Sequence, residues 1–474
     1  MAQSSQFPAT VASRPIQPWL VLAIILLADV VDLLDATITT IAAPSIAHSL
    51  GGGARLISWL GASYALSMGI LLVPGGRLGD KFGRKRLFLI GIAGFTAASV
   101  ACGLATSPTM IIVARVFQGG FGALMIPQGF GIISQAFTRE QMGQAFSAFG
   151  PVLGVSAVAG PLVAGALISA NIAGSGWRAA FLINLIVGVV AFLGALAILP
   201  PDDGDPAVHI DVPGALLLSA SLFGLLFGVI GGADAGWPAY TVATIFAGAL
   251  LFLTFIWQQR HTDTPLLAQS LFRNRGFVAG LIVGLIFFGA LTGLMLVVGL
   301  FVQTGLGYSP LEASLTTAPI AIGIVVSSIV ARNAVARLGR TLVFAGIGGV
   351  LAGVALIVAI LLVSPQTSDI SALHLALPLF IIGVGAGPAF AAVFDVALGD
   401  IAPDEAGSAS GSLTAVQQLA SAAGAASIST IYLHAVATSG QHQAVMTGLI
   451  VVAAGLALAL ICVRGMPRTA AAMP

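Results

Sequence analysis

The sequence carries very little charge. Only 7% of its 474 residues are Asp, Glu, Lys or Arg, whereas a soluble domain usually has about a quarter. Hydrophobic residues make up 58% of the chain, and the mean hydropathy is +1.06. A water-soluble chain could not hide so much apolar surface, because every folded protein leaves much of its surface exposed. We therefore expect lipid to be the solvent around most of this chain.

Other absences exclude whole classes of function. The net charge is only +1, so no basic domain is present to hold nucleic acid. The two cysteines, Cys102 and Cys462, lie far apart in apolar runs, which argues against a disulfide framework and against a metal site. The chain contains no Gly-x-x-x-x-Gly-Lys-Ser/Thr phosphate-binding loop. We therefore expect no cofactor and no metal, with an ion gradient as the energy source.

The apolar runs predict an all-α integral membrane protein. A bilayer core about 30 Å thick needs roughly 20 helical residues, and the runs are continuous, unlike the alternating strands of a transmembrane barrel. The first run is too long and too rich in Asp to be a cleaved signal peptide. We predict fourteen spans, at 19–45, 56–74, 87–105, 109–136, 141–170, 177–200, 212–232, 238–258, 277–303, 311–332, 341–363, 372–398, 407–436 and 443–463.

The distribution of Lys and Arg predicts the orientation, because cytoplasmic loops are enriched in these residues. If the basic segment Arg77–Arg86 is cytoplasmic, only Arg55 and Arg178 fall outside, and Arg115 lies within a span. Both termini are then cytoplasmic. The predicted tails are 1–18 and 464–474.

A weak internal repeat divides the chain into two halves. The matching positions are Gly83-Arg84 with Gly339-Arg340, Gly119 with Gly383, and Gly143 with Gly407. We predict six-helix bundles at 19–200 and 277–463, joined by a linker at 201–276 that contains two extra spans. Parallel repeats of this kind are a transporter architecture. The acids Asp202, Asp203, Asp205 and Asp211 of the linker are expected to be solvated.

The most specific motif is Gly76-x-Leu78-Gly79-Asp80-Lys81-x-Gly83-Arg84-Lys85, which predicts a tight turn over 74–86. A positive-inside loop explains its bases but neither the acid nor the glycine spacing. The motif resembles the signature loop of the major facilitator superfamily. The resemblance implies a conformational latch on the cytoplasmic side, made of Gly76, Asp80, Gly83, Arg84 and Lys85. In that family the acid is thought to meet a helix start in the second half, for which residues 404–407 are the candidates here.

Three acids in the first span are candidates for proton coupling. Asp29, Asp32 and Asp35 follow one another in steps of three along one flank of the helix. Ionisable residues inside a membrane are costly and usually functional, which suits these acids for proton exchange or for pairing with a cation. The alternative is that one or two of them face water near the end of the span, Asp29 before the others. The sequence leaves open which acid carries the proton.

Arg115 is the only base within a predicted span, and we expect it to meet a carboxylate, with a first-span Asp as the candidate. Leu34-Asp35-Ala36-Thr37 resembles the first-span motif of the fourteen-span drug:proton antiporters. Arg115-x-x-Gln118-Gly119 is similar to the fourth-span motif of the same superfamily, which is tied there to proton coupling. The alternative is that Arg115 is a purely structural tie between helices.

The fifth span contains glycines and prolines at helical spacing, which permit close helix packing and bending. The residues are Gly150, Pro151, Gly154, Gly160, Pro161 and Gly165. Ordinary small-residue packing is one interpretation. The pattern also resembles the antiporter signature found in exporters and absent from most uptake members. Gly176-Trp177-Arg178 with Phe181-Leu182-Ile183-Asn184 resembles the start of the sixth span in the fourteen-span branch.

These features predict a proton-coupled antiporter that exports lipophilic drugs or metabolites, cationic or neutral, by alternating access. We expect a monomeric, multi-pass protein of the plasma (inner) membrane that confers antibiotic resistance. Its expected partners are protons, membrane lipid and small lipophilic substrates. The candidate substrate-binding residues are Asp32, Asp35, Gln118, Trp59, Tyr64, Phe149 and Asp395. The alternative is a proton-coupled uptake symporter for a small organic solute. A membrane-embedded enzyme is not expected, because no convergent catalytic or metal-binding residues are evident.

Overall fold

The computed structural model describes residues 17–138, 141, 152, 156, 159–208, 210–262, 265, 269–331, 338–364, 369–398, 401 and 406–468. No β-strand occurs among them. The helices are α1 Pro18–Leu50, α2 Gly53–Phe82, α3 Arg84–Gly103, α4 Pro108–Ala136, η1 Ile172–Gly174, α6 Arg178–Ile198, α7 Val212–Ala235, α8 Ala239–His261, α9 Gln269–Arg273, α10 Arg275–Leu300, η2 Phe301–Gly305, α11 Pro310–Ala331, α13 Arg340–Val363, α14 Ala372–Ala397, α15 Ala406–Cys462 and η4 Val463–Gly465.

Within the described residues, 11 helices are long and apolar enough to cross a membrane, which shows a multi-pass membrane protein. The predicted count of fourteen is not confirmed. Helix α1 has 33 residues but is not among the eleven, and three acids lie within it. Helix α15 spans 57 residues and includes a non-helical residue, Gly440, where two predicted spans meet. Half of the predicted fifth span lies outside the described residues, and the described half includes an apolar helix at Ala159–Ala170.

The predicted turn over 74–86 is wrong in its extent. Helix α2 continues through Pro74 to Phe82, and only Gly83, at φ 95°, separates it from α3. The helix persists because α4 packs closely along it. A Cβ at Gly75 would lie 3.2 Å from the carbonyl carbon of Ala123, and Gln128 Nε2 donates to the Gly75 carbonyl at 2.8 Å. Tertiary contacts therefore outweigh the turn preference of the two adjacent glycines.

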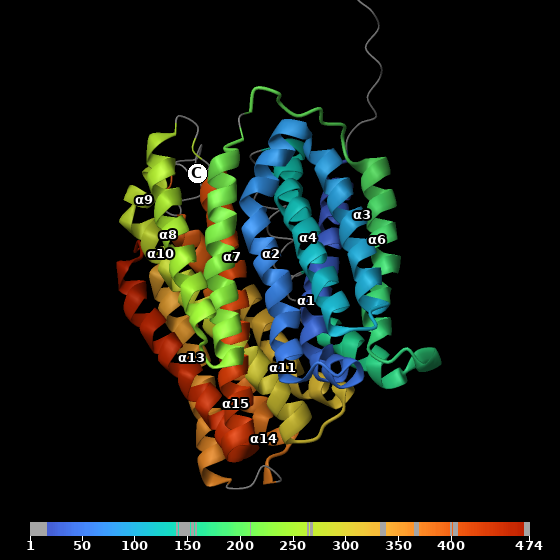
Figure 1. The fold of residues 1–474 in the computed structure, drawn as a ribbon, viewed down its shortest axis with the longest axis vertical. Coiled ribbons are helices and arrows are strands. Elements are labelled where there is room, and N and C mark those ends of the chain that lie inside the picture. The colour runs from blue at the N-terminus through green and yellow to red at the C-terminus, as the bar shows by residue number, and fades with distance from the viewer. Residues whose placement is uncertain are drawn as a thin grey trace, which may run out of the picture.

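Two groups of helices lie beside one another (Figure 1). Helices α1, α2, α3, α4 and α6 pack among themselves, and α10, α11, α13, α14 and α15 form the second group. The repeat predicted from glycines has a structural counterpart. A Cβ at Gly119 on α4 would lie 3.0 Å from the Tyr64 carbonyl carbon on α2, and one at Gly383 on α14 would lie 3.0 Å from Ile320 Cα on α11. Equivalent glycines thus allow equivalent helix pairs to approach closely.

Helix α7 contacts both groups, because it packs on α2 and on α15. Phe227 of α7 lies 5.8 Å from Trp59 of α2, centroid to centroid. Helix α8 is fastened to α7 at one end by Asp211, whose carboxylate accepts from Gly214 N and from Gln258 Nε2, both at 2.9 Å. The expectation that Asp211 is solvated is therefore wrong, because this side chain is buried as the N-cap of α7.

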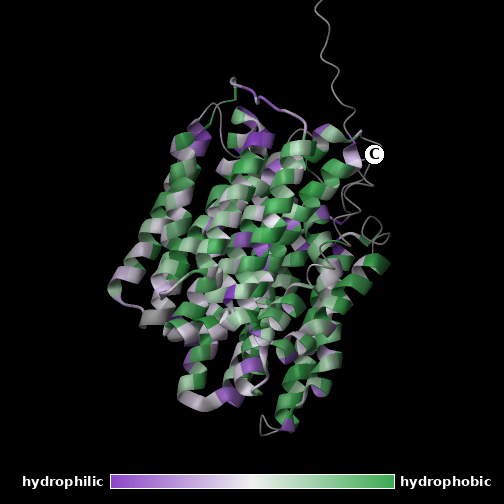
Figure 2. Cartoon of the chain, turned by 90° about the vertical axis from the view of Figure 1, so that its right-hand side faces the viewer, coloured by the Kyte–Doolittle hydropathy of each residue, from purple (hydrophilic) through white to green (hydrophobic). Residues whose placement is uncertain are grey.

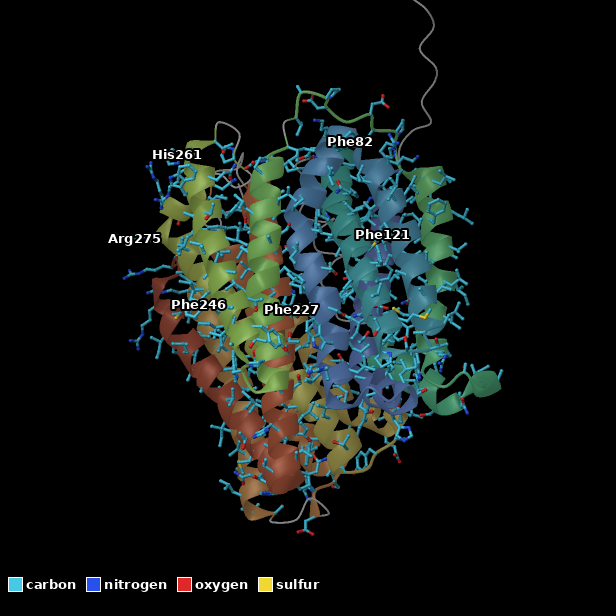
Figure 3. All side chains as sticks on the ribbon, in the orientation of Figure 1. Phe82, Phe121, Phe227, Phe246, His261 and Arg275 are labelled. Carbon is cyan, nitrogen blue, oxygen red and sulfur yellow. The ribbon has the colours of Figure 1, made fainter. Side chains whose placement is uncertain are left out.

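Hydrophilic residues concentrate at the two ends of the bundle, with a few at mid-height, while hydrophobic residues follow the length of the helices (Figure 2). Phe82 and His261, which end α2 and α8, lie at the same end (Figure 3). The C-terminal segment lies beside the start of α13, where Arg340 donates to the Arg464 carbonyl at 3.2 Å. The side of the membrane on which each end lies stays a prediction.

The linker between α6 and α7 docks on the end of α2, and this corrects the expectation that Asp202 is simply solvated. Asp202 Oδ2 accepts a hydrogen bond from Arg84 N at 2.9 Å, so it caps the start of α3. Asp205 N donates to the Asp80 carbonyl at 2.8 Å. The physical reason is that the first amide groups of a helix need acceptors and favour negative charge.

We predict that Asp202→Ala lowers the free energy of unfolding by about 1 kcal/mol, the usual cost of losing an N-cap. Asp203→Ala removes the same charge from an exposed neighbour and should have no measurable effect. Thermal unfolding of both variants in detergent micelles provides the comparison. Equal unfolding temperatures for the two variants would contradict the capping role of Asp202.

Candidate functional site

Helix α1 holds its three acids at increasing depth. Asp29 is partly buried, Asp32 is 8% exposed and Asp35 is 0% exposed. Their spacing places them on one flank of the helix, which faces the other helices of the first group. The two deeper carboxylates therefore need partners from neighbouring helices, because a buried charge without them is very costly.

Asp35 receives hydrogen bonds from three side chains. Arg115 Nη1 on α4 pairs with Asp35 Oδ2, and both side chains are almost fully buried. Gln118 Nε2 donates to Asp35 Oδ1 at 2.7 Å, and Asn184 Nδ2 of α6 donates to the same oxygen at 2.9 Å. The i, i+3 spacing of Arg115 and Gln118 places both on the same face of α4. The carboxylate is thus held by two helices other than its own.

Arg115 makes further hydrogen bonds in addition to its ion pair. Its Nε donates to the Leu60 carbonyl at 3.1 Å, and Nη1 donates to Gln118 Oε1 at 2.8 Å. The guanidinium carbon lies 4.3 Å from the centre of the Tyr64 ring, a distance typical of a cation–π contact. Arg115 therefore ties α1, α2 and α4 together at mid-bundle.

Tyr64 connects the second acid to this network. Its hydroxyl donates to Asp32 Oδ1 while its ring covers Arg115. Small residues on α4 make room for it, since a Cβ at Gly122 would lie 3.4 Å from the Tyr64 hydroxyl and 3.6 Å from Asp32 Oδ1. Two acids and one base therefore share one buried network. When both acids are ionised, the network carries a net negative charge.

Asn184 is a member of this network that was not among the candidate site residues. It is fully buried and donates to Ser99 Oγ at 2.9 Å as well as to Asp35. Two signals for it were available in the sequence, an amide within a largely apolar predicted span and its place in the motif at the start of the sixth span. Nothing in the sequence places that amide beside Asp35.

The remaining candidate substrate-binding residues lie outside this network. Trp59 packs against Phe227 of α7, and Asp395 is exposed on α14. Phe149 lies outside the described residues, as do Gly150, Pro151 and Gly154 of the fifth-span motif. The proposed roles of all these residues stay predictions.

The described end of the fifth-span motif meets both groups of helices. A Cβ at Gly160 would lie 3.1 Å from Thr37 Cβ on α1, and one at Gly165 would lie 3.0 Å from Leu311 Cα on α11. The Pro161 carbonyl accepts from Ser314 Oγ of α11 at 2.6 Å. This part of the motif therefore joins the two groups of helices.

Two basic residues of the signature loop, Arg84 and Lys85, bond to nearby backbone carbonyls and one acid. Arg84 pairs with Asp80 at 2.8 Å and donates to the Gly131 carbonyl at 2.8 Å. Lys85 Nζ donates to the Leu199 carbonyl at 2.6 Å, at the end of α6, where a cation is favoured. Of the helix start proposed to meet Asp80, at 404–407, residues 404 and 405 lie outside the described residues, so the latch stays a prediction.

A multi-span helical bundle with a charge network at its centre is typical of membrane transport proteins. A family model described as Major Facilitator Superfamily matches residues 25–425, and the chain belongs to this superfamily. Its curated relatives include a protein named "Probable actinorhodin transporter" from Streptomyces coelicolor. That relative is 41% identical over 419 residues, which cover 87% of this chain and 72% of the relative.

Two further relatives come from the same genus. "Puromycin resistance protein pur8" of Streptomyces alboniger is 34% identical and covers 87% of this chain and 81% of its own length. "Tetracenomycin C resistance and export protein" of Streptomyces glaucescens is 30% identical, over 88% of this chain and 78% of its own length. Among solved structures, an auto-inhibited peptide transporter of the POT family shares the fold with a TM-score of 0.65 and 15% identity, over 94% of this chain and 96% of the other.

The buried ion pair predicts a large coupling energy between its two residues. We expect Asp35→Asn and Arg115→Met each to lower the free energy of unfolding by about 3–5 kcal/mol, because each leaves one buried charge unpaired. The double variant should cost several kcal/mol less than the sum. Unfolding of the four proteins in mixed detergent micelles measures this cycle.

The control is the Asp80–Arg84 pair, whose side chains are 34% and 24% exposed. Its coupling should stay below about 1 kcal/mol, as is usual for exposed pairs. Additive effects at Asp35 and Arg115 would contradict the assignment of a tight buried pair.

Proposed function

We propose that this protein is a proton-coupled antiporter that exports lipophilic small molecules across the plasma membrane. The observation that carries the proposal is the buried network in which Asp35 and Arg115 pair beside Asp32. The names of three relatives support export, since they describe a probable actinorhodin transporter and two resistance proteins, one of them also an export protein. The fourteen-span arrangement, cytoplasmic termini, two six-helix halves and monomeric state belong to the same proposal.

Charge balance explains how the network couples two ligands. When Asp35 is ionised, it neutralises Arg115. A proton on Asp35 removes that neutralisation and weakens the tie between α1 and α4, whereas Asp32 remains available to a cation or a second proton. Proton and substrate are thus coupled if each favours one of the two conformations of the transporter.

In this cycle the outward-facing protein takes up a proton as substrate leaves, and the inward-facing protein releases the proton to the cytoplasm. The bare carboxylate then favours the next substrate. An excess of acids over bases in a site of low dielectric favours cationic or neutral lipophilic molecules over anions. Uptake by symport remains the alternative, but the fifth-span pattern and the relatives' names favour export.

We predict that Asp35→Asn abolishes accumulation of a lipophilic cation driven by a pH gradient, while membrane insertion is retained. The reason is that the amide cannot bind and release a proton. Uptake of externally added ethidium by everted membrane vesicles provides the measurement, and Asp369→Asn, on an exposed residue, is the control. Wild-type accumulation only in right-side-out vesicles would favour uptake, and normal exchange by Asp35→Asn would remove this residue from coupling.

The signature loop generates a separate prediction. If Asp80 latches the cytoplasmic side, Asp80→Asn should reduce transport severalfold and open that side, because the neutral amide attracts a helix start less strongly than a carboxylate does. Labelling of single cysteines placed on that side by a membrane-impermeant maleimide reports the opening. Unchanged labelling would count against the latch.

A further inference from the structure

The network contains one buried hydrogen-bond acceptor without a partner. Asn184 Oδ1 receives no hydrogen bond from any described residue, although the Asn184 side chain is fully buried and its Nδ2 is used twice. Buried polar atoms are normally paired, so an unpaired one needs an explanation. The position of this atom, on a side chain that already contacts Asp35, suggests one.

The orientation of the amide follows from its neighbours. Ser99 Oγ donates to the Phe181 carbonyl at 3.1 Å, so this hydroxyl can only accept from Asn184. Asp35, as a carboxylate, also accepts only. Both neighbours therefore require the nitrogen of Asn184, and the oxygen is left without a donor.

The three side chains around Asp35 differ in what they can offer to its protonated form. Arg115 has donors only. Gln118 has an acceptor, but Oε1 already receives a hydrogen bond from Arg115 at 2.8 Å and one from Cys102 Sγ at 3.6 Å. Asn184 donates to the carboxylate through Nδ2, and its acceptor Oδ1 is unpaired. It is the member of this trio that can serve both protonation states.

We propose that Asn184 is a positioning residue for proton exchange at Asp35, donating to the carboxylate and, after its amide rotates, accepting from the protonated acid. This inference rests on the proposed function. The step forms and breaks only hydrogen bonds: the carboxylic O–H bonds to Asn184 Oδ1 while Nδ2 leaves Asp35. Ser99 holds the amide in the orientation that suits the carboxylate.

Other ionisable groups face Asp35 and must stay intact in the test. They are Arg115 on α4, Tyr64 on α2, Cys102 on α3 and Asp32 on α1. Asn184→Leu keeps them all and removes both the donor and the acceptor. Ser99→Ala removes only the anchor of the amide. Thr96→Val is the matched control, because Thr96 is a buried residue one turn from Ser99 on α3 and makes no hydrogen bond to the network.

The first readout is the pH profile of tetraphenylphosphonium transport in proteoliposomes. Loss of a donor to the carboxylate favours the protonated acid, so Asn184→Leu should move the midpoint of the profile upward by about one pH unit, a tenfold change in the protonation equilibrium. Ser99→Ala should move it less, in the same direction, and Thr96→Val should match the wild type. A purely structural role would lower the amount of active protein without moving the midpoint.

The second readout needs no substrate. Infrared difference spectra of the purified protein at low and high pH contain the C=O stretch of protonated Asp35, which Asp35→Asn identifies by its loss. We expect this band at a higher wavenumber in Asn184→Leu, where the acid has lost its acceptor. A band and a pH profile that both match the wild type, in Asn184→Leu or, if that variant does not fold, in Ser99→Ala, would overturn the proposal. Absence of proton-coupled transport by the wild type would instead contradict the proposed function, which the infrared result does not test.

Discussion

The buried ion pair between Asp35 and Arg115 is the interaction on which the site depends. Taking two charges out of water costs several kcal/mol for each ion, and their attraction offsets this cost only when further hydrogen bonds complete the geometry. The structure supplies those bonds from Gln118 and Asn184 to Asp35, and from Arg115 Nε to the Leu60 carbonyl. Helices α1, α2, α4 and α6 are therefore held in register by a network that one proton can change.

Close helix packing makes this arrangement possible. Gly119 lets α4 approach α2 at the level of Tyr64, and its counterpart Gly383 does the same for α14 and α11. Gly165 brings the fifth-span segment against α11 of the other group. Small residues at such contacts allow helix backbones to approach closely. The same kind of packing thus supports the charge network within the first group and the contact between the two groups.

The fold was largely predictable, because continuous apolar runs determine where helices cross a membrane, and most helix ends lie within a few residues of the predicted bounds. The end of α2 was not predictable, because the glycines there, which favour a turn in isolation, pack against α4. Candidate acids and Arg115 stood out as charges in apolar runs. Asn184 and the cap formed by Asp202 did not, because an uncharged amide and a linker acid gain their meaning only from partners distant in sequence.

The central claim is that substrate and proton compete through Asp35. Proton release on substrate binding measures this most directly, with purified protein in weakly buffered detergent solution, a pH-sensitive dye and added tetraphenylphosphonium. The account predicts that wild-type protein releases protons when the cation binds, and that Asp35→Asn still binds the cation but releases fewer protons. Binding without proton release by the wild type, or equal release by both proteins, would contradict it.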